Sequence, residues 1–165
     1  MAHSGDCIFI KYKVIEKFVQ ARNTMNNSPV SQDSCVEFFI ALDDEDDYYN
    51  FEFNCIGTCK AAFGKNRRER SYLPDHRIDL INRQALIKTA KQSHNGLVAW
   101  ELTVSIPAEA FCHNKLISFR GMNGRANFYK CGDNLPEPHF IVWNEVQAEK
   151  PDFHLPEYFG RIRFL

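Results

Sequence analysis

The chain has 165 residues, enough for one folded domain that buries a core without disulfides or metal. Hydrophobic residues make up 44% and charged residues 25%, as in ordinary soluble globular proteins. The formal net charge of -1 gives no electrostatic reason to expect nucleic acid or an anionic membrane as partner. No apolar run approaches the ~20 residues that span a bilayer.

The six cysteines are expected to be free thiols, because a chain of this length does not need disulfides. Cys35 and Cys131 lie inside apolar strand patterns, where reduced cysteine behaves as a small hydrophobic residue. The polar start, residues 1–6, shows no secretory signal, although a precursor could have carried one. The compartment is left open.

Alternation of apolar and polar residues predicts a series of short strands in the first third of the chain. Residues 7–14 form the first, with Lys11 and Lys13 on its polar face. Residues 35–42 and 49–55 alternate in the same way and are expected to pair as a hairpin around the acidic run 43–47.

Residues 60–95 are the least regular part of the chain. The basic cluster at 65–70 is interpreted as an exposed loop, and residues 78–91 as a strand or a short helix. The clearest strand follows at 98–106, where Trp100 shares its face with Val98, Leu102 and Val104 and is expected in the core.

Pro107 ends that strand, and residues 107–111 are expected to form a short helical turn. Further strands are predicted at residues 124–131, 139–143 and 161–165. Many short strands with almost no helical periodicity predict an all-β fold, an antiparallel β-sandwich or jelly roll. We expect residues 1–165 to form a single domain.

Metal binding is not favoured by the spacing of ligand residues. Cys55 and Cys59 are tolerably spaced for zinc, but no second close pair follows and Cys55 falls on the apolar face of its strand. The acidic run 43–47 lacks the ligand order of an EF-hand and suits a solvated hairpin tip. No cofactor is therefore expected, beyond weak structural calcium at most.

Catalysis finds little support in the sequence. Glu37 and Glu52 lie on the polar faces of neighbouring strands, and glycoside hydrolysis needs two nearby carboxylates. Acidic residues are nevertheless usual on a solvated sheet face, where nothing raises the pKa of one of them. No nucleophile elbow surrounds any Ser or Cys. We expect no catalytic residues and no enzymatic activity.

Several segments together resemble one family: DSCVEFF at 33–39, YNFEFN at 49–54, WELTVSIP at 100–107, RANFYKCGD at 125–133 and PDFHLPEYFG at 151–160. The chain resembles the carbohydrate-binding module family 9-like proteins, best known from polysaccharide-using bacteria such as Bacteroides. The resemblance implies a β-sandwich of the DOMON-like type. It also implies binding of a sugar or oligosaccharide end between two aromatic rings, and structural calcium.

Carried onto this chain, the resemblance assigns the stacking ring to Phe153, just before the Pro-x-x-Phe-Gly ending, and the acidic site residue to Glu37. The second ring would fall near Ser31, where the sequence has none. Family members usually carry further strands before the start seen here, so the domain is expected to be N-terminally shortened. The predicted ligand-binding residues are Glu37, Glu52, Asn54, Arg125, Asn127, Trp143 and Phe153.

Two of these residues also have a purely structural interpretation. Asn127 could simply satisfy backbone groups, and Trp143, like Trp100, could belong to the core. The leading functional hypothesis is non-catalytic carbohydrate binding that serves polysaccharide use, with a glycoside hydrolase of the same pathway as partner.

The alternative is a structural or protein-interaction sandwich that has lost its sugar site, which the missing ring at Ser31 favours. A glycoside hydrolase-associated activity comes third. The family context implies a secreted or periplasmic protein, whereas the sequence without a signal fits the cytoplasm.

Overall fold

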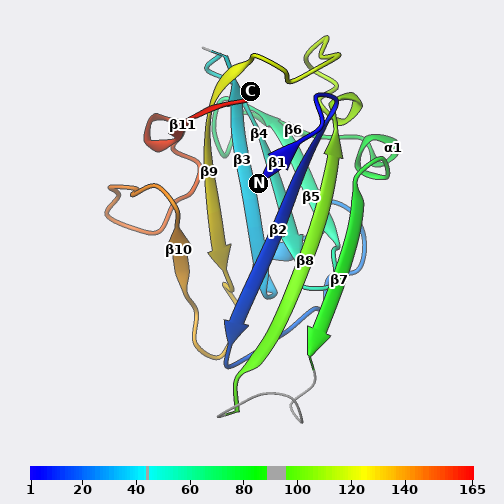
Figure 1. Cartoon of the computed structure of the whole chain (residues 1–165). Helices are drawn as coiled ribbons and strands as arrows, with labels where there is room; N and C mark the ends of the chain where they lie inside the picture. Colours follow the sequence, from blue (N-terminus) through cyan, green and yellow to red (C-terminus); the bar gives the residue numbers. More distant parts are fainter. Residues whose placement is uncertain (44, 89–95) are drawn as a thin grey trace.

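The computed structural model describes residues 1–43, 45–88 and 96–165. Two antiparallel sheets pack face to face, and in the view of Figure 1 strands β2 and β8 lie in front of β4 and β5. The prediction of an all-β antiparallel sandwich is confirmed. The first sheet has the order β1-β2-β8-β7. Its strands are β1 (Ala2–His3), β2 (Cys7–Glu16), β7 (Asn82–Lys88) and β8 (Val98–Pro107).

The second sheet has the order β10-β9-β3-β4-β5-β6, and β11 also pairs with β9. Strands β3 and β4 form the predicted hairpin. The strands of this sheet are β3 (Cys35–Leu42), β4 (Tyr48–Asn54), β5 (Cys59–Gly64), β6 (Arg70–Tyr72), β9 (Asn123–Cys131), β10 (Phe140–Val142) and β11 (Gly160–Arg163).

Within residues 1–43, 45–88 and 96–165, helical structure is confined to short turns between strands. In the stretch 78–91, which the sequence left open between a strand and a short helix, strand β7 forms after helix α1 (Asp75–Ile78) has ended, and residues 89–91 lie outside the described residues. The helical turn predicted after Pro107 is confirmed as η4 (Ala108–Ala110); two similar turns are η1 (Val30–Gln32) and η5 (Pro156–Tyr158). No helix within the described residues is long and apolar enough to span a membrane.

The main core lies between the two sheets. Val36, Phe38 and Ile40 of β3 point into it, as the alternation predicts, and meet Trp100 and Leu102 of β8. Trp100 is 0% exposed, and its indole Nε1 donates to Glu16 Oε1 at 2.6 Å. The predicted core position of Trp100 is therefore confirmed.

The opposite face of the second sheet is also buried, contrary to the expectation of a solvated face. Phe39 and Tyr48 point away from the main core and form a second apolar cluster with Tyr129 and Phe159. Phe153 packs against the same cluster, so the chain between β10 and β11 covers this side of the sheet. We call this side the outer face. Its burial creates a low-dielectric setting for every polar residue that β3, β4 and β9 place there.

Candidate functional site

A pocket opens on the outer face where the covering chain meets the strands, and we call it the outer-face pocket. Its cavity volume is ≈ 70 Å³, or ≈ 450 Å³ when the open solvent at its mouth is included. Its floor comes from the strands, and its walls come from the covering chain and from residues near β6. The lining residues are Ser31, Glu37, Glu52, Lys60, Arg67, Arg70, Cys131, Asp133, Phe140, Pro151, Asp152, Phe153 and His154.

Two carboxyl groups form the centre of the floor. Glu37 on β3 and Glu52 on β4 are direct cross-strand partners and are only 3% and 2% exposed. The expectation that both lie on a solvated face is therefore wrong. A buried carboxylate needs partners that compensate its lost hydration, and the two residues find different ones.

Glu52 is held by two cations and an amide. Lys60 Nζ lies 2.9 Å from both carboxylate oxygens, and Arg70 Nη1 lies 3.5 Å from Oε1. Asn50 Nδ2 also donates to Oε1 at 3.0 Å. The position of Lys60 follows from strand register, because β5 pairs with β4 and places Lys60 directly opposite Glu52.

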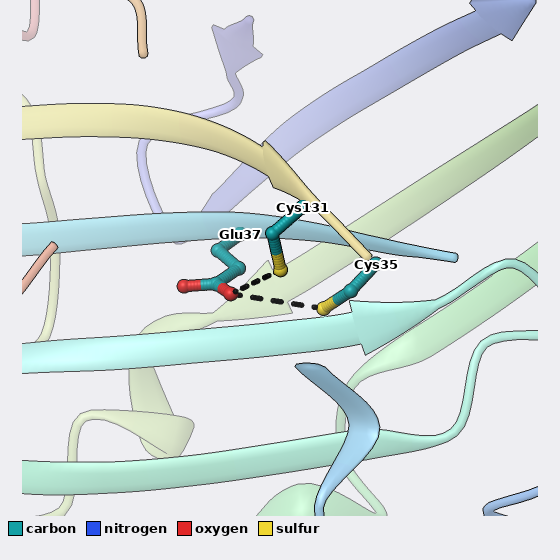
Figure 2. Close-up of side chains that lie close together, drawn as sticks. All are labelled: Cys35, Glu37 and Cys131. Atoms are coloured by element: carbon teal, nitrogen blue, oxygen red, sulfur yellow. Dashed lines mark hydrogen bonds between the residues drawn. The ribbon is translucent and has the colours of Figure 1, made fainter. Parts of the chain in front are cut away.

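Glu37 is surrounded by thiols instead of cations. Cys131 Sγ and Cys35 Sγ donate to its Oε1 over 3.2 Å and 3.8 Å, and the other carboxyl oxygen points away from both sulfurs (Figure 2). Burial, followed by the nearby Glu52 carboxylate, raises the pKa of Glu37 to about 8. The expectation that nothing raises the pKa of a carboxyl group here is wrong for Glu37.

An aromatic wall stands beside these polar groups. The Phe153 ring stacks on Tyr129, with centroids 4.2 Å apart and planes inclined by 13°, and Phe140 lies edge-on to it at 6.1 Å. Tyr129 Oη donates to the backbone oxygen of Phe153 at 3.1 Å. Phe153, the residue that the resemblance assigns to ligand contact, is thus held at the pocket by stacking of its ring and by a hydrogen bond to its backbone.

His154 positions the arginine at the edge of the pocket. Its Nε2 lies 3.3 Å from Arg70 Nη1, and since Arg can only donate, Nε2 accepts. The proton is then on Nδ1, which donates to Tyr48 Oη at 2.8 Å. Burial and the cations of Arg70, Arg67 and Lys60 lower the pKa of His154 to about 2, so the ring stays neutral.

The basic cluster at 65–70 is only partly the exposed loop that the sequence predicts. Arg67 and Arg68 are exposed, but the Arg70 side chain is 12% exposed and faces Glu52. Strand β6 brings it there by pairing with β5, opposite Gly64. Only glycine permits this approach, because a Cβ at Gly64 would lie 2.1 Å from the backbone oxygen of Glu69.

Of the seven predicted ligand-binding residues, Glu37, Glu52 and Phe153 line the outer-face pocket. Asn54 instead connects buried loops: its Nδ2 donates to Asn23 O at 2.8 Å and to Asp33 Oδ2 at 3.0 Å, and its Oδ1 accepts from Thr58 N at 2.9 Å.

Asn127 also serves the backbone, which confirms its structural interpretation. Its Nδ2 donates to Asn144 O at 2.9 Å, and its Oδ1 accepts from Asn144 N at 2.8 Å. These bonds fix the start of the covering chain. Arg125 lies opposite Ala41, and its guanidinium donates to Glu45 O at 2.9 Å and Pro156 O at 3.4 Å.

Trp143 is not a core residue, in contrast to the structural interpretation. Its side chain is 57% exposed and meets Phe128 edge-on, with centroids 5.6 Å apart. It lines a separate shallow hollow with Val14, Phe128 and Ile141, outside the pocket.

Most cationic and neutral polar members of the pocket, above all Lys60, Arg70 and His154, were not predicted from the sequence. Lys60 carried a signal, because it is the one charged residue of the strand CKAAFG and shares a face with buried partners. Nothing comparable marks Arg70 or His154, since Arg70 reaches the pocket on the three-residue strand β6 and His154 on the chain between β10 and β11, and the position of both depends on tertiary packing.

Comparison with known proteins agrees with this architecture. The family model described as carbohydrate-binding family 9 matches residues 1–164. One similar crystal structure is that of a protein from Bacteroides uniformis described as a candidate carbohydrate-binding protein. It is 36% identical in sequence with a TM-score of 0.91, and the match covers 99% of this chain and 76% of that one. No curated protein shows significant similarity to the chain.

A more distant structural neighbour is a family 9 carbohydrate-binding module from Caldicellulosiruptor kristjanssonii, solved in complex with glucose. It is 12% identical with a TM-score of 0.56, and the match covers 98% of this chain and 72% of that one. At this identity the likeness concerns the fold alone.

Proposed function

Because the chain belongs to carbohydrate-binding family 9, we propose that the outer-face pocket binds a sugar and catalyses no reaction on it. The observation that carries the proposal is the meeting, in one pocket, of an aromatic ring with a set of largely buried ionisable side chains. Phe153 supplies the ring, and Glu37, Glu52, Lys60 and Arg70 supply the polar groups.

This combination matches the two surfaces of a pyranose. The C–H faces of a sugar ring are apolar and stack on aromatic side chains, whereas its hydroxyl groups need donors and acceptors in the ring plane. Phe153 offers the apolar surface, and the Glu52–Lys60 pair offers charge-assisted hydrogen bonds beside it. The related module from Caldicellulosiruptor kristjanssonii was solved with glucose, which supports a sugar as ligand class.

The polar groups are already ordered before any ligand arrives. Glu52 is fixed by Lys60, Arg70 and Asn50, and Arg70 is fixed in turn by His154. Ordered side chains lose little rotamer entropy on binding, so more of each contact is available as affinity. The same order argues against catalysis, because both oxygens of Glu52 already accept hydrogen bonds from Lys60.

The pocket differs from a two-ring clamp. Ser31 lines the pocket where the resemblance places the second ring, and Phe140 stands beside Phe153 on the same wall. One stacking surface instead of two lowers the apolar contact with the sugar, so we expect modest affinity. A glycoside hydrolase that acts on the same polysaccharide remains the proposed partner, on the family resemblance.

Calorimetric titration with a panel of mono- and oligosaccharides tests the proposal. At least one sugar should bind, and Phe153→Ala should weaken it at least tenfold. Trp143→Ala is the matched control, since it removes an exposed aromatic ring outside the pocket and should leave the affinity unchanged. Circular dichroism establishes that both variants are folded.

If no sugar in the panel binds, or if Phe153→Ala binds as tightly as wild type, the pocket is not a sugar site. The first result would favour the alternative, a structural or interaction sandwich. Release of reducing sugar from any polysaccharide in the panel would contradict the assignment as a non-enzyme.

A further inference from the structure

Two thiols and one carboxyl group converge on the floor of the outer-face pocket. Cys35 Sγ, Cys131 Sγ and a Glu37 carboxyl oxygen all lie within 4.8 Å of one another, and all three residues are buried. Figure 2 shows the two sulfurs directed at the same carboxyl oxygen from neighbouring strands. We call these residues the Cys35–Glu37–Cys131 cluster.

Strand pairing alone creates the cluster. Cys35 on β3 lies directly opposite Cys131 on β9, and Glu37 follows two positions along β3 on the same face. The ligand atoms therefore sit on two central strands of a sheet, which is a more rigid support than a loop.

We propose that the Cys35–Glu37–Cys131 cluster binds a thiophilic divalent cation, of which zinc is the reference ion. Tetrahedral zinc has Zn–S bonds of ~2.3 Å and Zn–O bonds of ~2.1 Å, so a bound sulfur and oxygen are ~3.6 Å apart. The two sulfur–oxygen distances in the cluster are 3.2 Å and 3.8 Å, on either side of that value. The two sulfurs lie within 4.8 Å of each other, and a tetrahedral ion would hold them ~3.8 Å apart. On binding, the two thiol protons and any carboxyl proton leave to solvent.

The surrounding charges suit a cation held by three anionic ligands. Two thiolates and one carboxylate carry three negative charges, so a divalent ion leaves a net charge of minus one. The adjoining Glu52, Lys60 and Arg70 together carry plus one, and they line the same pocket. Lys60 and Arg70 therefore offset part of the negative charge of the ligands, which lowers the free energy that burial of an unbalanced charge would require.

The ion also has a path to the site and an open coordination position. Cys131 and Glu37 line the outer-face pocket, so one side of the cluster faces its interior. Three protein ligands and an open fourth position describe the arrangement in which zinc retains a water molecule. A hydroxyl group of a pocket ligand could replace that water.

Other buried cysteines lack these features. Cys55 and Cys59 belong to the apolar core between the sheets. Cys35 and Cys131 share a carboxyl group with each other and meet the pocket instead. The inference rests on this difference and on the cluster geometry, and it is independent of the proposed sugar binding.

Cadmium titration of the reduced, chelator-treated full chain tests the inference, because thiolate–cadmium bonds give an ultraviolet charge-transfer band. We expect the band to saturate at one equivalent and zinc to remove it by competition. Cys35→Ser and Cys131→Ser should each abolish it or weaken binding at least a hundredfold, and Glu37→Gln, which replaces an anionic ligand with a neutral amide, should weaken it at least tenfold. Cys112→Ser, which removes an exposed thiol, is the matched control and should leave it unchanged.

A second measurement uses only the wild-type protein, in case the serine variants do not fold. Zinc should slow alkylation of Cys35 and Cys131, located by peptide mapping, at least tenfold while Cys112 reacts at its usual rate. A folded wild type without a saturable charge-transfer band would overturn the inference. So would a band that survives in both serine variants, or alkylation of Cys35 and Cys131 that zinc does not slow.

Discussion

Glu37 and Glu52 face each other directly across β3 and β4, yet they occupy opposite electrostatic settings. Glu52 is paired with Lys60 and Arg70, whereas the Glu37 carboxyl group accepts hydrogen bonds only from thiols within the part of the chain that the structure describes. Two carboxyl groups on one buried face can coexist because the cations of β5 and β6 compensate one of them. The pocket floor therefore combines the charged carboxylate of Glu52 with the carboxyl group of Glu37, whose ionisation is opposed by burial.

The core prediction concerns Trp100. Replacing this fully buried residue by alanine removes a large apolar side chain and leaves Glu16 Oε1 without its indole donor. Trp100→Ala should lower the free energy of unfolding by about 3–5 kcal/mol, measured by urea denaturation. Trp143→Ala, at an exposed ring, should change it by less than about 1 kcal/mol. Equal effects of the two substitutions would contradict the assigned burial.

Lys60 tests the buried ion pair. Lys60→Met leaves the Glu52 carboxylate with Arg70 as its remaining cation and should destabilise the fold by ~3 kcal/mol. Glu52→Gln combined with Lys60→Met removes both members of the 2.9 Å pair, so it should cost less than the sum of the two single substitutions. A double-mutant cycle in urea measures the coupling. Additive effects of the two substitutions would show that the pair does not interact.

His154 predicts a pH dependence of stability. Its pKa is about 2 when folded, below the ~6.5 of an unfolded histidine, so the unfolded state binds a proton first as pH falls. This contribution to stability is complete above pH ~6.5 and declines as pH falls from there towards the folded pKa, by about 1–2 kcal/mol between pH 7 and pH 5.

His154→Gln should remove that part of the pH dependence while Gln can still meet Tyr48 and Arg70. The comparison uses the difference between wild type and variant, because the other groups near the ring (Tyr48, Arg70, Arg67 and Lys60) are common to both. Identical pH profiles from chemical denaturation would rule out the neutral, buried histidine.

A substitution of Asn54 distinguishes a structural role for this residue from direct contact with a ligand. The side-chain amide of Asn54 makes hydrogen bonds with Asn23, Asp33 and Thr58, outside the pocket. Asn54→Ala should lower stability by about 1–3 kcal/mol through unsatisfied buried groups, measured by urea denaturation. Affinity for any sugar that depends on Phe153 should be unchanged. A tenfold loss of sugar affinity in a folded Asn54→Ala would place Asn54 in direct ligand contact after all.

Local patterns were sufficient to predict the sandwich and its main core. Strand periodicity depends only on neighbouring residues, so the alternation around Trp100, and that of Val36, Phe38 and Ile40, identified the face that meets the other sheet. The motif resemblance likewise gave Phe153 and Glu37, because both lie inside contiguous segments of characteristic sequence. The turn after Pro107 followed from the same kind of local information.

Only the tertiary structure decided what happens on the other face. Periodicity distinguishes two sides of a strand but does not say what covers the second, and here the chain between β10 and β11 returns to bury Glu37, Glu52 and Phe39. Arg70 and His154 meet through that return, from positions 84 apart. Cys131 and Glu37, 94 apart, meet through strand register. Such contacts depend on how sheets pair and loops pack, which no local pattern encodes.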